Sequence, residues 1–177
     1  SNGKINCCQI CGNKELIKII NLGHQAPCDS LIWPEQLSQA EKRYPLNLLR
    51  CKKCGLVQID HVVEPEELFF AEYPYRSGIT STLANNLRNT ASTIVKRYKL
   101  PEGGLAVDLG SNDGTLLEGF QREKMRVLGF EPTNIANLAN EKGIKTIKKF
   151  FNNLLVSEIT KEYGKAEVIT ACNMFAH

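Results

Sequence analysis

Apolar residues in the first part of the chain form short runs, each bounded by Gly, Pro or Cys. The runs are Leu16–Ile20, Leu46–Leu49 and Leu56–Ile59. Prolines recur between and after them, and short apolar runs separated by such breakers are typical of strands joined by loops. The pattern predicts a small, loop-rich, β-leaning domain over residues 1–75.

From Ile79 onward the apolar spacing becomes helical, because Leu83, Leu87 and Ala91 share one face that continues to Tyr98. We expect a helix of about 20 residues there, ended by the proline and glycines at 101–104. After it, short apolar segments alternate with amphipathic ones. The alternation predicts strands at 105–109, 126–130, 144–147 and 167–171, and helices at 115–124, 134–142 and 153–163. Such alternation is typical of a parallel, doubly wound α/β sheet over residues 76–177.

Charge adds little to this picture, since 22 basic against 19 acidic side chains give a formal charge of +3. No concentrated basic patch is present, so we expect no nucleic-acid partner. No stretch reaches the roughly 18 apolar residues of a spanning helix, and no secretory signal begins the chain, so we expect a cytoplasmic protein without a membrane partner. The sequence does not specify an oligomeric state.

Seven cysteines cannot all pair within one chain, and four of them lie in two Cys-x-x-Cys-Gly motifs, Cys8 to Gly12 and Cys51 to Gly55. A two-residue spacer lets both thiolates of a turn face one ion, and four thiolates favour a closed structural Zn²⁺ site. The predicted ligands are Cys8, Cys11, Cys51 and Cys54. A rubredoxin-type iron site and Cys7 in place of Cys8 remain open alternatives. The long stretch between the motifs predicts an inserted excursion.

Two further cysteines, Cys28 and Cys172, are expected to be buried small hydrophobic residues.

The predicted strand 105–109 leads into Asp108-Leu-Gly110-Ser111-Asn112-Asp113-Gly114, which opens a helix. Glycines at such a turn let a ligand approach the backbone. A dinucleotide fingerprint needs glycine where Asn112 stands, so S-adenosylmethionine is favoured over a dinucleotide. Glu131, followed by Pro132 at the end of the next strand, is placed to accept ribose hydroxyls. Asn112 and Asp113 could equally be turn formers.

These motifs occur in a fixed order with two more, Tyr73-Pro-Tyr75-Arg-Ser77 and Asn173-Met-Phe-Ala-His177. Together they resemble the zinc-containing, S-adenosylmethionine-dependent sugar C-methyltransferases that act on nucleotide-linked keto-deoxysugars. The resemblance implies a zinc-binding domain followed by the N-terminal half of a Rossmann-like class I methyltransferase sheet. It also implies a nucleotide-sugar substrate.

Carried onto this sequence, the resemblance gives the four cysteines to zinc and places Tyr75 and His177 in the active site. It gives these residues to the cofactor: Asp108, Gly110, Ser111, Asn112, Gly114, Glu131, Pro132 and Asn173. Because sheets of this class have seven strands, we expect the chain to be an N-terminal piece with little turnover.

Methylation of carbon needs a proton removed α to a ketone and a stabilised enolate, so His177 could act as base and Tyr75 as donor to the enolate oxygen. An O- or N-methyltransferase and a non-catalytic zinc-binding interaction module are the alternatives.

Overall fold

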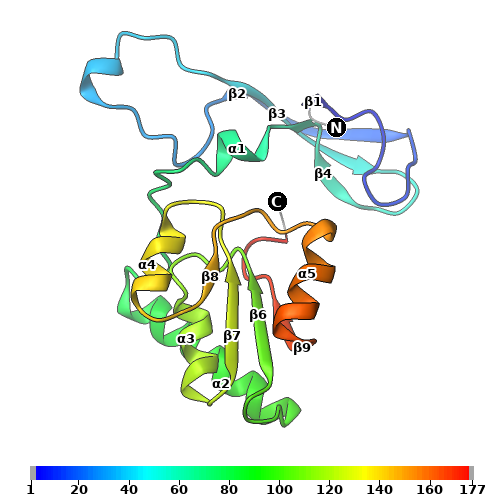
Figure 1. Cartoon of the computed structure of the whole chain (residues 1–177). Helices are drawn as coiled ribbons and strands as arrows, with labels where there is room; N and C mark the ends of the chain where they lie inside the picture. Colours follow the sequence, from blue (N-terminus) through cyan, green and yellow to red (C-terminus); the bar gives the residue numbers. More distant parts are fainter. Residues whose placement is uncertain (1–2, 176–177) are drawn as a thin grey trace. The chain divides into compact units, whose positions relative to one another are not determined.

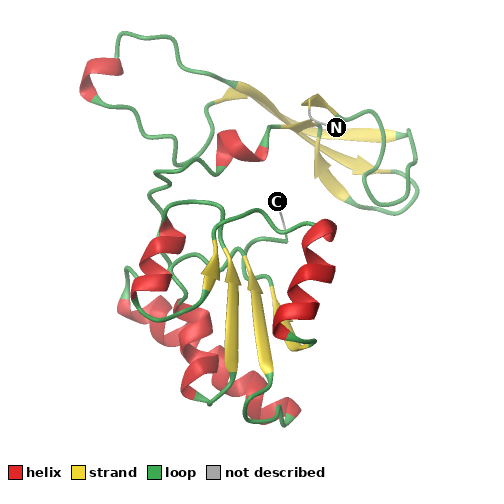
Figure 2. Ribbon diagram, viewed as in Figure 1, coloured by secondary structure: helices red, strands yellow, loops and turns green. Residues whose placement is uncertain are grey.

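The computed structural model describes residues 3–175, which divide after Phe69 into two compact units. Each unit is described by itself (Figures 1 and 2). The division comes earlier than the boundary expected at residue 75. The reason is that the intervening segment is hydrogen-bonded to the second unit: the Asn134 amide donates to the Ala71 carbonyl, and the Asn112 side chain donates to the Tyr75 carbonyl.

The first unit is built on an antiparallel sheet of β2 (Leu16–Gln25), β3 (Tyr44–Cys51) and β4 (Val57–Ile59), in that order. A short pair, β1 (Gly3–Lys4) with β5 (His61–Val62), and a four-residue helix, α1 (Pro65–Leu68), were not anticipated from the sequence. The expected excursion lies between β2 and β3, where residues 26–43 contain only a 3-10 turn, η1 (Pro34–Gln36).

Little of the first unit is buried. Among its described residues, only Cys8, Cys51 and Gln58 are buried, while apolar side chains on β2 such as Ile19 and Leu22 are about half exposed. A domain this small with so little buried apolar surface usually needs a metal or disulfides for stability. The cysteine cluster is therefore the centre of this unit.

The second unit has the predicted parallel α/β fold. Its strands are β6 (Leu105–Leu109), β7 (Arg126–Phe130), β8 (Thr146–Ile147) and β9 (Ala166–Thr170), in the spatial order β8-β7-β6-β9. Its helices are α2 (Ser81–Tyr98), α3 (Thr115–Arg122), α4 (Ile135–Glu141) and α5 (Asn153–Tyr163). The mixed α/β fold class is thus confirmed, and the strands depart from prediction mainly at β8, which is two residues long.

Alternation along β6 gives the sheet two apolar faces. Ala106 belongs to the cluster formed with α2, α3 and α4, whereas Leu105 and Val107 face the other way, toward Leu155 and Ile159 of α5. This period-two pattern is what a strand covered by helices on both sides requires. The carboxyl ends of β6 and β7 are consequently held side by side within a packed layer.

Among the described residues, no helix is both long and apolar enough to cross a membrane.

Helices α2 and α3 approach closely at Gly119 of α3. A Cβ on Gly119 would lie 2.7 Å from the Ala91 Cβ and 2.9 Å from the Arg88 Cα. Both Ala91 and Gly119 are buried, so neither helix can yield toward solvent without opening the core.

We predict that Gly119→Ala destabilises the second unit by about 1–2 kcal/mol, because overpacking outweighs the gain of about 1 kcal/mol in helix propensity. Urea unfolding followed by helical circular dichroism measures this, since nearly all helix belongs to that unit. The control Asn89→Ala, on the exposed surface of α2, should be neutral or stabilising. A stabilised Gly119→Ala variant would show that the helices are not in tight contact.

Candidate metal centre and cofactor loop

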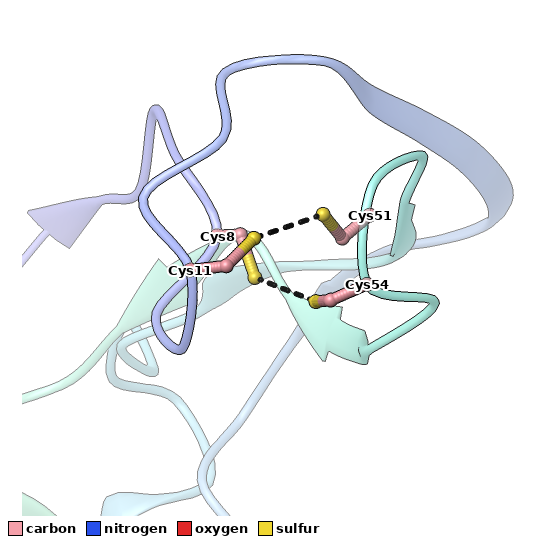
Figure 3. Close-up of side chains that lie close together, drawn as sticks. All are labelled: Cys8, Cys11, Cys51 and Cys54. Atoms are coloured by element: carbon pink, nitrogen blue, oxygen red, sulfur yellow. Dashed lines mark hydrogen bonds between the residues drawn. The ribbon is translucent and has the colours of Figure 1, made fainter.

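Four cysteine sulfurs converge in the first unit. The Sγ atoms of Cys8, Cys11, Cys51 and Cys54 all lie within 4.8 Å of one another, with Cys8 to Cys54 at 3.5 Å and Cys11 to Cys51 at 3.6 Å (Figure 3). A tetrahedral zinc ion with Zn–S bonds of about 2.3 Å sets its sulfurs about 3.8 Å apart. The donor set therefore fits a zinc ion with all four positions filled by thiolates.

The two knuckles have the same backbone design. In each, the glycine amide donates to the carbonyl of the first cysteine: Gly12 to Cys8 at 2.9 Å and Gly55 to Cys51 at 3.0 Å. The pKa of Cys51 falls to about 6, mainly because the Cys54 amide donates to its sulfur, while burial acts in the opposite direction. The Cys11 amide similarly lowers the pKa of Cys8. Each turn thus favours the thiolate form of its first cysteine, which a metal needs.

Gln58 ties the two halves of the centre together. Its side chain, buried on β4, accepts from the Gln9 amide at 3.0 Å and donates to the Cys7 carbonyl at 3.3 Å. Both contacts flank Cys8, so Gln58 fixes the first knuckle against the sheet that carries the second. The sequence pattern assigned no role to Gln58.

The remaining cysteines lie outside the cluster. Cys7 is exposed beside Cys8, and the four-sulfur set includes Cys8 instead. The prediction that Cys28 and Cys172 are buried is wrong, since both are exposed. Cys28 lies in the 26–43 excursion and Cys172 follows β9 at the edge of the sheet, where few side chains cover it.

In the second unit, the glycine loop leaves β6 and bonds at once to the end of β7. The amides of Gly110 and Ser111 both donate to the Phe130 carbonyl at 2.9 Å. Gly110 has φ +72°, and a Cβ there would lie 2.8 Å from Cγ of Met174. Only glycine combines this backbone conformation with so close a neighbour.

Glu131 is buried and already holds three hydrogen bonds. Its Oε2 accepts from the Asn112 amide at 3.0 Å, and its Oε1 accepts from the Thr133 amide at 3.0 Å and hydroxyl at 2.7 Å. A carboxylate offers about four acceptor positions. One position on Oε2 is left, so accepting two ribose hydroxyls would require a Thr133 bond to be given up.

Asp108, the acid that the motif places at the end of β6, is 2% exposed. Burial raises its pKa to about 6; the Thr170 hydroxyl, which donates to Oδ1 at 2.7 Å, acts against this, and the nearby charge of Glu131 adds to it. Two buried carboxylates thus lie at the ends of adjacent strands, with Asp108 poised near neutral pH.

The glycine loop and Glu131 have hydrogen-bonding groups that could bind a polar ligand. The Ser111 hydroxyl is buried without a partner in the described part of the chain, and Glu131 keeps one acceptor position. Buried polar groups rarely remain unpaired. Gly114 lies at φ +77° and ends the loop where α3 begins.

The structure thus brings together Asp108, Gly110, Ser111, Asn112, Gly114 and Glu131 at the carboxyl ends of β6 and β7, with Pro132 next to Glu131. Tyr75 joins them through its backbone, because its carbonyl accepts from the Asn112 side chain at 3.0 Å, while its own side chain is 45% exposed. Asn173 is exposed after β9, and His177 lies outside the described residues.

Comparison with known proteins shows which proteins the chain resembles. Residues 8–69 match the zinc-binding domain of the family Methyltransf_13. Over 174 residues, 98% of the chain, the sequence is 31% identical to the C-methyltransferase NovU of Streptomyces niveus. The chain is thus similar to a C-methyltransferase along nearly its whole length, and its first unit matches a zinc-binding domain. It spans 41% of the length of NovU.

The match to a zinc-binding domain agrees with the geometry of the first unit. The matched domain begins at Cys8 and includes the four-cysteine cluster. Zinc is therefore the metal that both the donor set and the matched domain support.

The metal centre gives a direct prediction, in which Cys8→Ser lowers bound zinc well below one ion per chain while Cys7→Ser leaves it at one. The reason is that removing one of four thiolates opens the closed site, whereas Cys7 contributes no sulfur to it. Metal analysis after dialysis against a weak chelator measures both. Loss of zinc from Cys7→Ser and retention by Cys8→Ser would reverse the assignment.

Asp108 gives a second prediction, on pH dependence. Its folded pKa of about 6 exceeds the ordinary value of 3.8, so its contribution to stability is complete below about pH 4 and is lost as pH rises through 6. We expect the free energy of unfolding of Asp108→Asn to rise by about 2–3 kcal/mol relative to that of wild type as the pH is raised from 4 to 7.5.

Urea unfolding of the second unit at several pH values measures this difference. The control Glu158→Gln, on the exposed side of α5, should follow the wild-type pH profile. A constant difference between Asp108→Asn and wild type across this range would contradict the raised pKa.

Proposed function

We propose that this chain is part of an S-adenosylmethionine-dependent enzyme that methylates a carbon of a nucleotide-linked keto-deoxysugar. The observation that carries the proposal is the similarity to a C-methyltransferase along 98% of the chain, which extends through the glycine loop. The loop supports it, because glycine at 110 and a buried carboxylate at 131 provide a backbone surface and an acceptor at one end of the sheet.

The residues proposed to hold the cofactor are those at the ends of β6 and β7. Glu131 would accept a ribose hydroxyl, and the free hydroxyl of Ser111 would donate to or accept from a polar atom of the ligand. When bound, S-adenosylmethionine supplies an electrophilic methyl group on a sulfonium. The closed four-thiolate site leaves no coordination position for substrate, so zinc has a structural role in this proposal.

The remaining steps belong to the protein and the sugar. A base removes the proton α to the ketone, and we assign this role to His177. The hydroxyl of Tyr75 donates to the enolate oxygen as charge develops there. The α-carbon then forms the new carbon–carbon bond as the methyl–sulfur bond breaks, and the neutral thioether leaves.

Calorimetry with S-adenosylmethionine tests cofactor binding. We expect the zinc-loaded chain to bind one equivalent, and Glu131→Gln to weaken binding at least about tenfold, because a hydrogen bond to a charged acceptor is lost. Glu158→Gln is the matched control and should bind as wild type does. No heat of binding with wild type would contradict the proposal.

Deuterium exchange tests the carbon chemistry. Incubation of a keto-deoxysugar nucleotide with the protein in D₂O should incorporate deuterium α to the ketone, since proton removal precedes methylation. O- or N-methylation needs no such exchange. Absence of exchange would count against His177 as base.

A further inference from the structure

Asn112 stands where a dinucleotide loop has its second glycine, yet its backbone amide and both polar atoms of its side chain are hydrogen-bonded. Its amide donates to Oε2 of Glu131 at 3.0 Å, its Nδ2 donates to the Tyr75 carbonyl at 3.0 Å, and its Oδ1 accepts from the Ser77 amide at 2.8 Å. The residue is only 9% exposed. One buried residue therefore connects the end of β7, through its backbone amide, with the segment that precedes α2, through its side chain.

Asparagine suits this position for two independent reasons. Its φ of 51° lies in the left-handed region, which asparagine tolerates better than most residues other than glycine. Its side-chain amide also offers one donor to the Tyr75 carbonyl and one acceptor to the backbone N–H of Ser77, two residues further on. Aspartate would face the Tyr75 carbonyl with a second acceptor, and glycine would have the backbone freedom without the side chain.

Asp113 ties the same segment one residue further on. Its Oδ2 accepts from the Gly78 amide at 3.1 Å, and a Cβ on Gly78 would lie 2.4 Å from that oxygen. Lys142, which directly follows α4, contacts the same oxygen at 3.3 Å. The segment thus lies directly against the glycine loop, held there by two consecutive side chains.

The tied segment has little structure of its own. Residues 70–80 contain neither helix nor strand, and the bond from the Ile79 amide to the Arg76 carbonyl closes a turn at Ser77 and Gly78. A segment held mainly by a few side-chain bonds opens locally at low cost. The position of Tyr75 therefore depends on the conformation of the loop at 112.

We propose that Asn112 is a positioning residue that couples cofactor binding at the glycine loop and Glu131 to the placement of Tyr75. This inference rests on the proposed function. A ligand that binds Glu131 and the loop in the conformation seen here stabilises the Asn112 backbone geometry, and with it the two side-chain bonds to residues 75 and 77. By linkage, the factor by which the ligand stabilises these bonds equals the factor by which the bonds strengthen ligand binding. Breaking the bonds therefore weakens ligand binding.

Hydrogen exchange of the Ser77 amide in the zinc-loaded chain, with and without S-adenosylmethionine, tests the coupling. In wild type we expect protection of this amide and a further rise on ligand addition. Asn112→Gly keeps the backbone conformation and deletes the amide side chain. We expect its Ser77 amide to exchange about tenfold faster, ligand to restore no protection, and S-adenosylmethionine to bind about tenfold more weakly.

A second variant removes the hydrogen bond between Ser77 and Asn112 by changing its donor instead of its acceptor. Ser77→Pro removes the donor N–H at a turn position that proline favours, and it changes no residue of the glycine loop. It should weaken S-adenosylmethionine binding in the same direction as Asn112→Gly, while Asn89→Ala on α2 should match wild type.

The outcomes separate the two proposals. Wild-type protein that fails to bind S-adenosylmethionine overturns the proposed function and the coupling with it. The coupling alone is overturned if wild-type protein binds, both variants bind equally well, and Asn112→Gly gains the same Ser77 protection on ligand addition. Weaker binding in both variants, with loss of the ligand-dependent protection in Asn112→Gly, supports it.

Discussion

The arrangement of the second unit depends on how its buried carboxylates are satisfied at the ends of β6 and β7. Asp108, Asp113 and Glu131 are each at most 6% exposed, and burying a charge without partners is costly. Their partners are therefore drawn in from separate parts of the chain: the Thr170 hydroxyl from β9, the Gly78 amide from the segment before α2, and the Asn112 amide from the loop itself. These bonds determine the loop conformation and bring Tyr75 to it.

The two units are stabilised in different ways. The second buries apolar side chains on both faces of a parallel sheet, as an ordinary α/β domain does. The described part of the first buries two cysteines and a glutamine and leaves most of its apolar strand residues exposed. Zinc bound to four thiolates would therefore contribute directly to folding of the first unit. Its knuckle amides, which lower the pKa values of Cys8 and Cys51, prepare the sulfurs for that metal.

Elements with a clear local signal were predicted well. The β6 strand and the α5 helix have the expected bounds, because their apolar periodicity and flanking breakers are strong. The paired strands β1 and β5 and the helix α1 were missed, since elements of two to four residues are too short to show a hydrophobic periodicity. Burial of Cys28 and Cys172 was predicted wrongly because residue type alone does not show which parts of a chain lack a covering layer.

The sequence by itself determined the alternating α/β order, the two Cys-x-x-Cys-Gly knuckles and the glycine loop, since each depends on residues close together in the chain. Only the tertiary structure showed that Cys8, and not Cys7, joins the four sulfurs, and that Asn112 is bonded to residues 75 and 77. It also showed that Glu131 is already committed to loop and Thr133 donors. Such pairings join residues far apart in sequence, and their hydrogen bonds form only once packing has set the strand ends side by side.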